Sequence, residues 1–430
     1  MRLPHFERWR AFGAPRYRPF QLIAIGQACT ISYASDALFV PLLLKLGAPP
    51  ELVTVVGSIP IAGSALQALA PQLLRRLHGN LRVLTLTLAL FEIRGFVHAG
   101  IAAAFAAGLI PAPVAIVLVS ATVAVGQTAG ALSGSNITLW TAVVLREEER
   151  RLVGPRMGAT TMALATLLLL PAGALLDAGL HTIGMWAYAI LFAVGGLTSA
   201  LTPYAVSRLP QPGRVLVREP EGDAECEPLP EPFLRFTAAS AIASAGQGIL
   251  PYLSLYAINV LHASPGYAVT LSAAGSAAAL FGSMFAGSFL LTGSASRLFR
   301  ASLAARAAAA VICAVSIPGS PLALTTLLLG SALFNGAGNA GMLAANERLY
   351  RLAPPELRVR CQSHFVSRTS FAFALGAGTA AVVLTLGAPV TWAAYSALFL
   401  GSGVCRSVSA LRTEVTASWQ SPIAPTDTDP

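Results

Sequence analysis

The feature that most constrains this chain is a series of apolar stretches, each about 20 residues long, separated by short polar segments. A stretch of that length is what one α-helix needs to cross the hydrocarbon core of a bilayer. Inside hydrocarbon, a helix satisfies its own backbone hydrogen bonds, which an open strand cannot do. We therefore predict twelve membrane-spanning helices, at residues 21–44, 52–74, 82–108, 113–144, 155–178, 184–206, 235–260, 267–292, 299–317, 321–349, 362–386 and 389–411.

Composition excludes the other classes of protein. Apolar residues make up 55% of the 430 residues and charged residues 11%, whereas a soluble domain has about 25% charged residues. With 19 acids and 28 bases, the chain cannot cover the surfaces of the soluble domains that its length would otherwise form. Disordered chains are poor in apolar residues, so disorder is excluded as well. The predicted fold class is an all-α polytopic membrane protein.

Basic residues gather on one side of the predicted membrane. The N-terminal arm, residues 1–20, is rich in arginine and lacks a small-residue cleavage site, so it does not resemble a removable signal peptide. If that arm is cytoplasmic, every basic residue except Lys45, Arg94 and Arg306 lies at or near a cytoplasmic end of a span, which is the positive-inside pattern. Topology thus explains the net charge of +9, and no nucleic-acid partner is expected. The strong bias toward arginine favours a bacterial inner membrane, with both termini cytoplasmic.

The charge pattern also divides the chain. Residues 207–234 are polar, rich in proline and acidic toward their end, which is typical of a cytoplasmic linker. The predicted organisation is a basic arm, a six-helix bundle, this linker, a second six-helix bundle and a disordered cytoplasmic tail, at residues 1–20, 21–206, 207–234, 235–411 and 412–430 respectively.

The two predicted bundles repeat short sequences at similar offsets. Gln127–Gly130 corresponds to Asn335–Gly338, and Ala62–Ala65 corresponds to residues 274–277. The pattern Glu-x-Arg occurs at Glu148 and Arg150 and again at Glu356 and Arg358. Internal repeats with a site between them are the usual plan of secondary transporters.

With these features the chain resembles the major facilitator superfamily of twelve-span transporters. Residues 139–156 resemble the charged loop which that family places between spans 4 and 5. Residues 71–82 keep several arginines of the family's loop between spans 2 and 3 but lack its aspartate. Residues 122–128 lack the arginine that proton-coupled drug exporters carry in span 4. The resemblance therefore implies a transporter, and it does not imply a drug exporter.

Four charged residues, Asp36, Glu92, Arg94 and Arg306, fall inside predicted spans. A charge near a helix centre costs about 2.5–3.5 kcal/mol to insert, so each should have a partner or a function. Glu92 and Arg94 are two positions apart and point to different sides of their helix, whereas Asp36 and Arg94 lie at similar depths. We hypothesise an Asp36–Arg94 pair, which is either structural, a coupling or substrate site, or an anchor near the interface. Arg306 is the repeat counterpart of Arg94, and both fall in spans that are peripheral in the family, which favours a structural role.

The resemblance implies that spans 1, 4, 7 and 10 line a central cavity. Those spans carry amides, hydroxyls and aromatic rings, and the candidate cavity residues are Tyr33, Gln127, Asn136, Gln247, Tyr252, Asn335 and Asn339. Such groups suit a neutral or amphipathic organic solute. The alternative is that they hydrogen-bond neighbouring helices.

Charges at the predicted cytoplasmic face form a candidate gate. Its members are Glu148, Arg150, Arg156, Glu356 and Arg358. Salt bridges between the two bundles would favour the outward-facing state and would break when the bundles rock. The alternative is that these charges are solvated and unpaired across the bundles.

The expected function is secondary active transport of a small organic solute by alternating access. Asp36 and Glu92 are the acids well inside the membrane, and removal from water favours the neutral form of a carboxyl group. Proton coupling is therefore expected, although uniport remains open, and the sequence fixes neither the substrate nor the direction. We expect a monomer whose partners are the solute and the lipid bilayer.

Two other functions are compatible with a polytopic membrane chain. One is a transporter-like scaffold or sensor that moves no solute, which the missing aspartate of residues 71–82 permits. The other is a membrane enzyme, but no H-E-x-x-H, G-x-S-x-G or P-loop pattern occurs, so no catalytic residue is assigned. The five cysteines are scattered without a metal-binding spacing, so neither a metal nor an organic cofactor is expected, and a proton gradient is the expected energy source.

Overall fold

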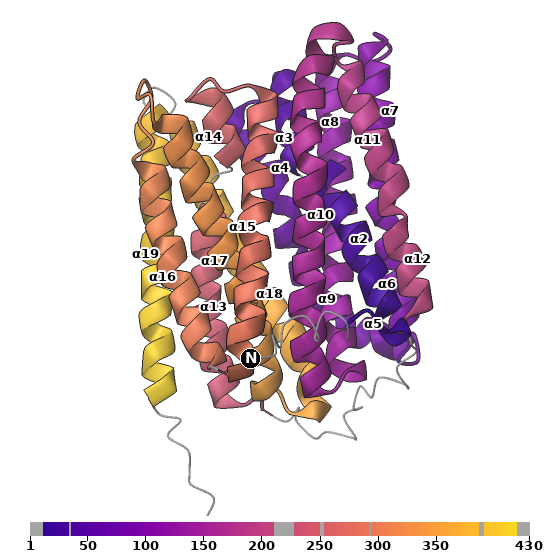
Figure 1. Cartoon of the computed structure of the whole chain (residues 1–430), viewed down its shortest axis with the longest axis vertical. Coiled ribbons are helices and arrows are strands. Elements are labelled where there is room, and N and C mark those ends of the chain that lie inside the picture. The colour runs from indigo at the N-terminus through magenta and orange to yellow at the C-terminus, as the bar shows by residue number, and fades with distance from the viewer. Residues whose placement is uncertain are drawn as a thin grey trace, which may run out of the picture.

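The computed structural model describes residues 12–33, 36–209, 228–249, 253–292, 294–386 and 391–418. These residues form long helices arranged side by side in two groups (Figure 1). The N-terminal half is drawn in indigo to magenta and the C-terminal half in salmon to yellow. Each half has six helical segments that cross the bundle. The predicted all-α fold of twelve segments in two six-helix bundles is therefore confirmed.

Most segments of the N-terminal half consist of two or three consecutive helices. The first two segments are η1 (Pro15–Tyr17), α2 (Arg18–Tyr33) and α3 (Asp36–Lys45), then α4 (Pro50–Gly63), η2 (Ser64–Leu69) and α5 (Ala70–Arg76). The next two are α6 (Leu81–Leu90), η3 (Phe91–Arg94) and α7 (Gly95–Ala106), then α8 (Ala112–Thr122), η4 (Val123–Gln127) and α9 (Thr128–Val144). The last two are α10 (Glu147–Thr182), then α11 (Trp186–Ser199) and α12 (Leu201–Arg208).

The C-terminal half is built mainly from uninterrupted helices. Its segments are α13 (Glu231–Ile249) with α14 (Leu253–Asn259), α15 (Pro265–Thr292), α16 (Ala295–Ala314), α17 (Ala323–Leu352), η5 (Pro355–Leu357) with α18 (Arg358–Leu386), and α19 (Thr391–Ser418).

Local sequence signals explain where several helices begin and end. The turns after α3 and α16 contain Gly47 and Gly319, whose φ angles of 88° and 80° are accessible to glycine without steric cost. The Asn80 side chain accepts a hydrogen bond from the Val83 backbone N–H, 3.1 Å away, which caps the start of α6. Three glutamates, Glu147–Glu149, occupy the first turn of α10, where a carboxylate interacts favourably with the helix dipole.

Nine of the described segments are long and apolar enough to cross a membrane. The other three, α16, α17 and α19, run alongside the other long helices of the bundle (Figure 1) but are more polar than the nine. Arg306 lies in α16, Asn335 and Asn339 lie in α17, and Arg406 lies in α19. The chain is therefore a multi-pass membrane protein whose C-terminal half contains its most polar spans.

Several predicted boundaries differ from the helix bounds, among them the limits of the linker and of the C-terminal tail. Helix α12 extends through Arg208 and α13 begins at Glu231, so both ends of the predicted linker are helical; residues 210–227 lie outside the described part. Helix α19 continues through Ser418, where the sequence predicted a disordered tail from residue 412. The helix continues because Ser409 and Thr413 remain buried, and the Ser409 hydroxyl donates to the Ala239 carbonyl of α13 at 2.7 Å.

The two halves meet along two pairs of helices. Helix α10 packs along α15, and α18 packs against α4 and η2 (Figure 1). At the first contact, a Cβ atom on Gly173 would lie 2.9 Å from the Gly266 carbonyl oxygen, so the backbones approach closely there. The lower end in Figure 1, with loops 77–80 and 145–146, is called the arginine-rich end, and the upper end, with loops 46–49 and 107–111, is called the opposite end.

Candidate functional site

A cavity of about 670 Å³ lies between the two halves. Helices α2, α9 and α10 line it from one half, and α15, α17 and α18 line it from the other. Its volume is in the range typical of small-molecule sites, about 300–1,000 Å³. The lining is mostly apolar, with polar residues that include Gln27, Arg94, Gln127, Asn339, Asn346 and Glu347.

Gln127 lines the cavity and has an unused side-chain donor. It ends η4, a single π-helical turn between α8 and α9, and such turns frequently occur at functional sites. Its Nε2 atom is buried and has no acceptor among the described residues. An unsatisfied buried donor costs about 1–3 kcal/mol. A solute that placed an oxygen here would supply the missing hydrogen bond.

Asn339 lines the cavity from the other half. Its Nδ2 atom donates to the Ala279 carbonyl oxygen at 3.0 Å and also contacts the Ser283 hydroxyl, both on α15. These bonds fix the orientation of the amide. Gln127 and Asn339 therefore place one amide from each half against the same space.

Arg94 brings a positive charge to the cavity wall. It ends η3, is 8% exposed, and its Nη1 atom donates to the Gly126 carbonyl oxygen at 3.4 Å. A Cβ atom on Gly126 would lie 2.4 Å from Cδ of Arg94, so the glycine makes room for this arginine. Span 3 thus reaches the cavity through one long side chain.

The two acids predicted inside the membrane, Asp36 and Glu92, are placed only by their backbone. Asp36 begins α3 and Glu92 lies in η3, and both side chains fall outside the described part of the structure. The Asp36–Arg94 pair therefore stays a prediction.

Other candidate cavity residues make their hydrogen bonds away from the cavity, Tyr33 and Asn136 to neighbouring helices and Asn335 within its own helix. The Tyr33 hydroxyl donates to the Leu168 carbonyl oxygen at 3.3 Å, and Asn136 Oδ1 accepts from Gln67 Nε2 at 3.0 Å. Asn335 Nδ2 donates to the Ser331 carbonyl oxygen at 2.9 Å. None of these three is among the residues that line the cavity, and neither is Gln247, which contacts two arginines. Tyr252 lies outside the described residues.

Ion pairs join the halves at the arginine-rich end. Arg151 Nε of α10 lies 3.2 Å from Glu347 Oε1 of α17, and the Glu347 side chain is only 6% exposed. Arg351 Nη2 lies 3.7 Å from Glu147 Oε1 across the same gap. The Tyr350 hydroxyl adds a hydrogen bond of 2.8 Å to the Thr138 carbonyl oxygen.

The predicted gate residues lie around these ion pairs. Arg358 crosses to the N-terminal half and donates to the Ala142 carbonyl oxygen at 3.3 Å. The Arg150 guanidinium stacks 5.1 Å from the centre of the Tyr350 ring. Arg156 donates to the Leu152 carbonyl oxygen of its own helix at 2.9 Å, while Glu148 and Glu356 are exposed. The acids in the ion pairs between the halves are thus Glu147 and Glu347. The sequence predicted Glu148 and Glu356, which lie one and nine positions further along the chain.

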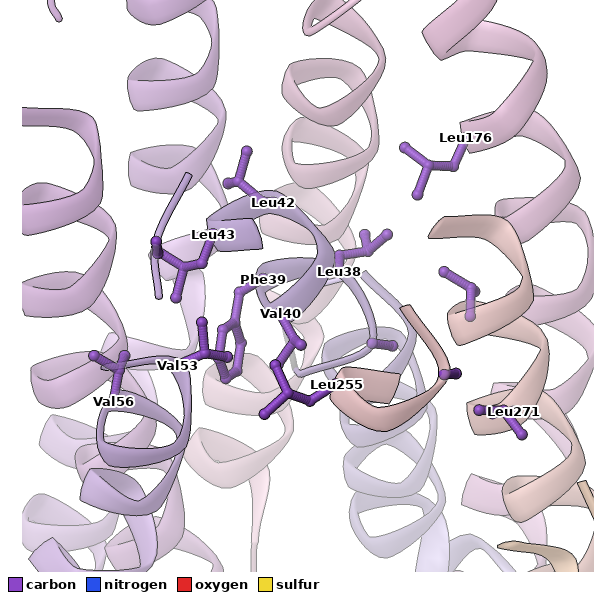
Figure 2. Close-up of a cluster of buried hydrophobic side chains, with 14 of the residues drawn as sticks. Leu38, Phe39, Val40, Leu42, Leu43, Val53, Val56, Leu176, Leu255 and Leu271 are labelled. Carbon is purple, nitrogen blue, oxygen red and sulfur yellow. The ribbon is translucent and has the colours of Figure 1, made fainter. Parts of the chain in front are cut away.

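The opposite end is closed by apolar side chains. Figure 2 shows the cluster, to which α3 contributes Leu38 and Phe39, α4 contributes Val53, and α14 contributes Leu255. All four are fully buried. Beside the cluster, the Asp177 carboxylate of α10 accepts from the Gly266 backbone N–H and the Ser264 hydroxyl, each at 2.8 Å. The cavity is therefore shut at this end by dry packing and one hydrogen-bonded carboxylate.

One buried charge was assigned to the wrong environment from the sequence. Arg406 was counted with the cytoplasmic bases, but its side chain is completely buried between α13, α17 and α19. Arg406 lies inside the predicted last span, residues 389–411, and this position indicates an arginine within the membrane rather than at its cytoplasmic face.

Solved structures of transporters resemble the chain over nearly its whole length. No protein-family model matches the sequence, and no curated protein matches it. A proton:xylose symporter of the major facilitator superfamily is 14% identical, with 91% of this chain and 94% of that chain covered and a TM-score of 0.66. A POT family transporter in complex with a thioalcohol-conjugated peptide is 13% identical (96% and 98% covered, TM-score 0.66), and the human organic anion transporter MFSD10 is 15% identical (91% and 100% covered, TM-score 0.60).

Two six-helix bundles with a cavity between them define a polytopic membrane protein. At identities of 13–15%, the likeness establishes the fold. That fold is the one of the major facilitator superfamily.

Proposed function

We propose that the protein is a secondary active transporter that moves a small organic solute by alternating access. The observation that carries the proposal is the cavity, which both halves line and beside which the halves make ionic contacts at one end and apolar contacts at the other. A single site between two repeats that rock against each other is the usual arrangement in secondary transporters. The rocking units would be the two bundles, residues 21–206 and 235–411, and the active form would be a monomer.

The contacts at the arginine-rich end are suited to reversible opening. Burying an ion pair costs desolvation that largely offsets its attraction, so two charges that water solvates when they separate can part at little net cost. By the positive-inside rule this end faces the cytoplasm, so both termini would be cytoplasmic in a bacterial inner membrane. Breaking the pairs of Arg151 with Glu347 and of Arg351 with Glu147 would then expose the cavity to the cytoplasm.

Proton coupling would use the acids of the N-terminal half. Asp36 and Glu92 lie on the same bundle as Arg94, which reaches the cavity wall. A carboxyl group away from water is neutral more readily than an exposed one. Exchange of Arg94 between such a carboxylate and the solute would link protonation to binding.

The amides in the cavity provide the test. Purified full-length protein should be screened against solute classes by thermal unfolding at pH 5.5 and 7.5, since a ligand that binds the native state raises the melting temperature. Any compound that acts is then supplied, radiolabelled, to proteoliposomes with an imposed proton gradient. We expect Gln127→Ala and Asn339→Ala to abolish both the thermal shift and the flux, whereas Glu148→Gln should leave both unchanged.

Two results would contradict the proposal in different ways. Ligand binding without flux under any gradient would favour a sensor or scaffold. Flux that is independent of pH in the wild type, and unchanged in Asp36→Asn and Glu92→Gln, would favour uniport and remove proton coupling.

A further inference from the structure

Two arginines meet inside the C-terminal half at one amide oxygen. Arg406 Nη2 of α19 donates to Gln247 Oε1 of α13 at 2.8 Å, and Arg306 Nη2 of α16 contacts the same oxygen atom. Both guanidinium groups lie over the Phe334 ring of α17, at 4.2 Å for Arg306 and 4.7 Å for Arg406. Four helices therefore hold two like charges against one neutral acceptor and one ring.

The sequence offers these arginines no acidic partner in their own half. Between residues 235 and 411 the only acids are Glu347 and Glu356, and both lie at the arginine-rich end. Among the described residues, the other hydrogen-bond partners of Arg406 are Gly246 and Ser402, both neutral. Like charges repel strongly where the surroundings are less polarisable than water. Paired buried charges are the rule in proteins, so this cluster lacks its counter-charge.

The cluster also has unused donors that converge. A guanidinium group has five N–H donors. Within the described part of the chain, the Nε atoms of both arginines are buried without an acceptor, and Arg306 makes a single hydrogen bond. Arg406 is anchored by the Gly246 and Ser402 carbonyl oxygens at 3.2 and 3.1 Å. Arg406, which is anchored, and Arg306, which is less constrained, thus share one acceptor oxygen. Their positive charge has no counter-charge there, and some of their N–H donors have no acceptor.

We propose that Arg306, Arg406 and Gln247 form a binding site for a small anion. Guanidinium groups bind chloride through charge and bind carboxylates and other oxyanions through paired N–H donors as well. The anion would be an inorganic ion from the medium or the carboxylate of a solute. Only the second source rests on the proposed transport function.

The site lies one helix away from the cavity. Arg306 packs against Gly338 of α17, where an added Cβ atom would lie 3.4 Å from Arg306 Nε. The next residue, Asn339, lines the cavity. A bound anion would therefore affect the helix that carries Asn339, because α17 is held on one side by the arginines and on the other by α15.

The sharpest test places the counter-charge in the protein itself. In Gln247→Glu, a carboxylate replaces the amide that both arginines contact. Its negative charge supplies the counter-charge that the bound anion would otherwise provide. We expect this variant to unfold at a higher temperature than the wild type in a low-salt zwitterionic buffer, and to lose the response to added anions. Gln72→Glu, on the exposed surface of α5, is the matched control and should behave like the wild type.

The anion response is measured by thermal unfolding of the full-length protein. Sodium chloride, nitrate, formate or lactate is titrated into the wild type, and we expect a melting temperature that rises and saturates. In Arg306→Gln and Arg406→Gln, the concentration at half-saturation should rise by at least about tenfold, the effect of losing one charge-assisted hydrogen bond. Arg297→Gln, exposed on the same helix as Arg306, corrects for the general effect of salt.

The outcomes separate the two sources of the anion and the two proposals. Saturation by chloride and nitrate identifies an inorganic ion, and saturation by carboxylates alone identifies a group of the solute. Equal, unsaturated responses in the wild type, Gln247→Glu and both controls would overturn the site. Solute flux with no anion response would then leave the transport proposal standing, whereas an anion response without flux would refute transport alone.

Discussion

The two ends of the bundle close the space between the halves by different physical means. At the opposite end, Leu38 and Leu255 belong to an apolar cluster from which water is excluded (Figure 2). At the arginine-rich end, Arg151 and Glu347 form an ion pair whose arginine side chain is 22% exposed. Separating apolar surfaces costs free energy in proportion to the area exposed, about 25 cal/mol per Å². Separating the two charges costs much less, because water that solvates them on opening returns the desolvation cost of burying Glu347.

The two kinds of contact therefore respond to different changes: the apolar contacts to substitutions that introduce charge, and the ionic contacts to the salt concentration. A dry apolar closure is insensitive to salt and tolerates no charge. An ionic closure weakens as ionic strength rises, because mobile ions screen the pair. Changes in salt should therefore alter the fraction of molecules in which the ionic end is closed. A single charged substitution should disrupt the packing at the apolar end.

The largest effect is expected from a charge in the apolar cluster. Leu38→Asp removes a fully buried leucine and introduces a carboxylate without a partner, which should destabilise the protein by about 3–5 kcal/mol. Thermal unfolding in detergent measures the change. Leu38→Met, which conserves volume, should cost less than about 1.5 kcal/mol. Equal melting temperatures for the two variants would mean that the cluster does not hold this end.

A smaller effect is expected where the backbones of the two halves touch. Gly173→Ala places a Cβ atom 2.9 Å from the Gly266 carbonyl oxygen, so α10 and α15 must separate, at a cost of about 1–3 kcal/mol. Gly100→Ala is the control, because nothing lies within 4 Å of its added Cβ atom and alanine favours a helix. The two melting temperatures should move in opposite directions. A shared direction would show that the close contact between the halves is not needed.

At the ionic end, Glu347→Gln should shift a population more than it lowers stability. Glu347 of α17 pairs with Arg151 of α10 at 3.2 Å, so its neutralisation removes the shortest ion pair between the halves at this end. Spin labels at Glu148→Cys and Glu356→Cys, with the native cysteines replaced by alanine, report the separation by electron resonance. We expect a longer distance in Glu347→Gln, reproduced in the unmutated pair by high salt. An unchanged distance distribution would exclude this ion pair as a gate.

The smallest effect is expected from the two exposed glutamates of the gate predicted from the sequence. Glu148 and Glu356 both lie at the surface. Glu148→Gln and Glu356→Gln should each change stability by less than about 0.5 kcal/mol, as exposed substitutions generally do. The same thermal unfolding assay measures this. A larger loss in either variant would restore that residue to the gate.

The architecture could be predicted because apolar stretches and arginine clusters follow directly from the cost of transferring groups into hydrocarbon. The interruptions could not. The residues of η4, Val-Ala-Val-Gly-Gln, show no signal for a π-helical turn, and the turn lies where Gly126 contacts Arg94 of the neighbouring span. Contacts between segments decide such breaks, and a single sequence does not contain them explicitly.

The side chains of the site were only partly predictable for a related reason. Gln127 and Asn339 face the cavity, whereas Gln247 faces Arg306 and Arg406, because the rotation of each helix about its axis decides which polar group meets the cavity. Span 7 carries polar residues on two faces, so its sequence fits either rotation. Among the consecutive glutamates 147–149, each residue turns by about 100°, and only the contact with α17 selects Glu147.

The polarity of α16, α17 and α19 has a consequence for the biogenesis of the protein. An arginine near the centre of a helix adds about 2.5–3.5 kcal/mol to the cost of entering the bilayer from the translocation channel. Helices α16 and α19 carry Arg306 and Arg406, and both side chains contact Gln247 of α13. These helices would therefore leave the channel together with earlier spans rather than one at a time. Substitutions that disturb Gln247 should then lower the amount of protein found in the membrane, even where the molecules that do insert remain active.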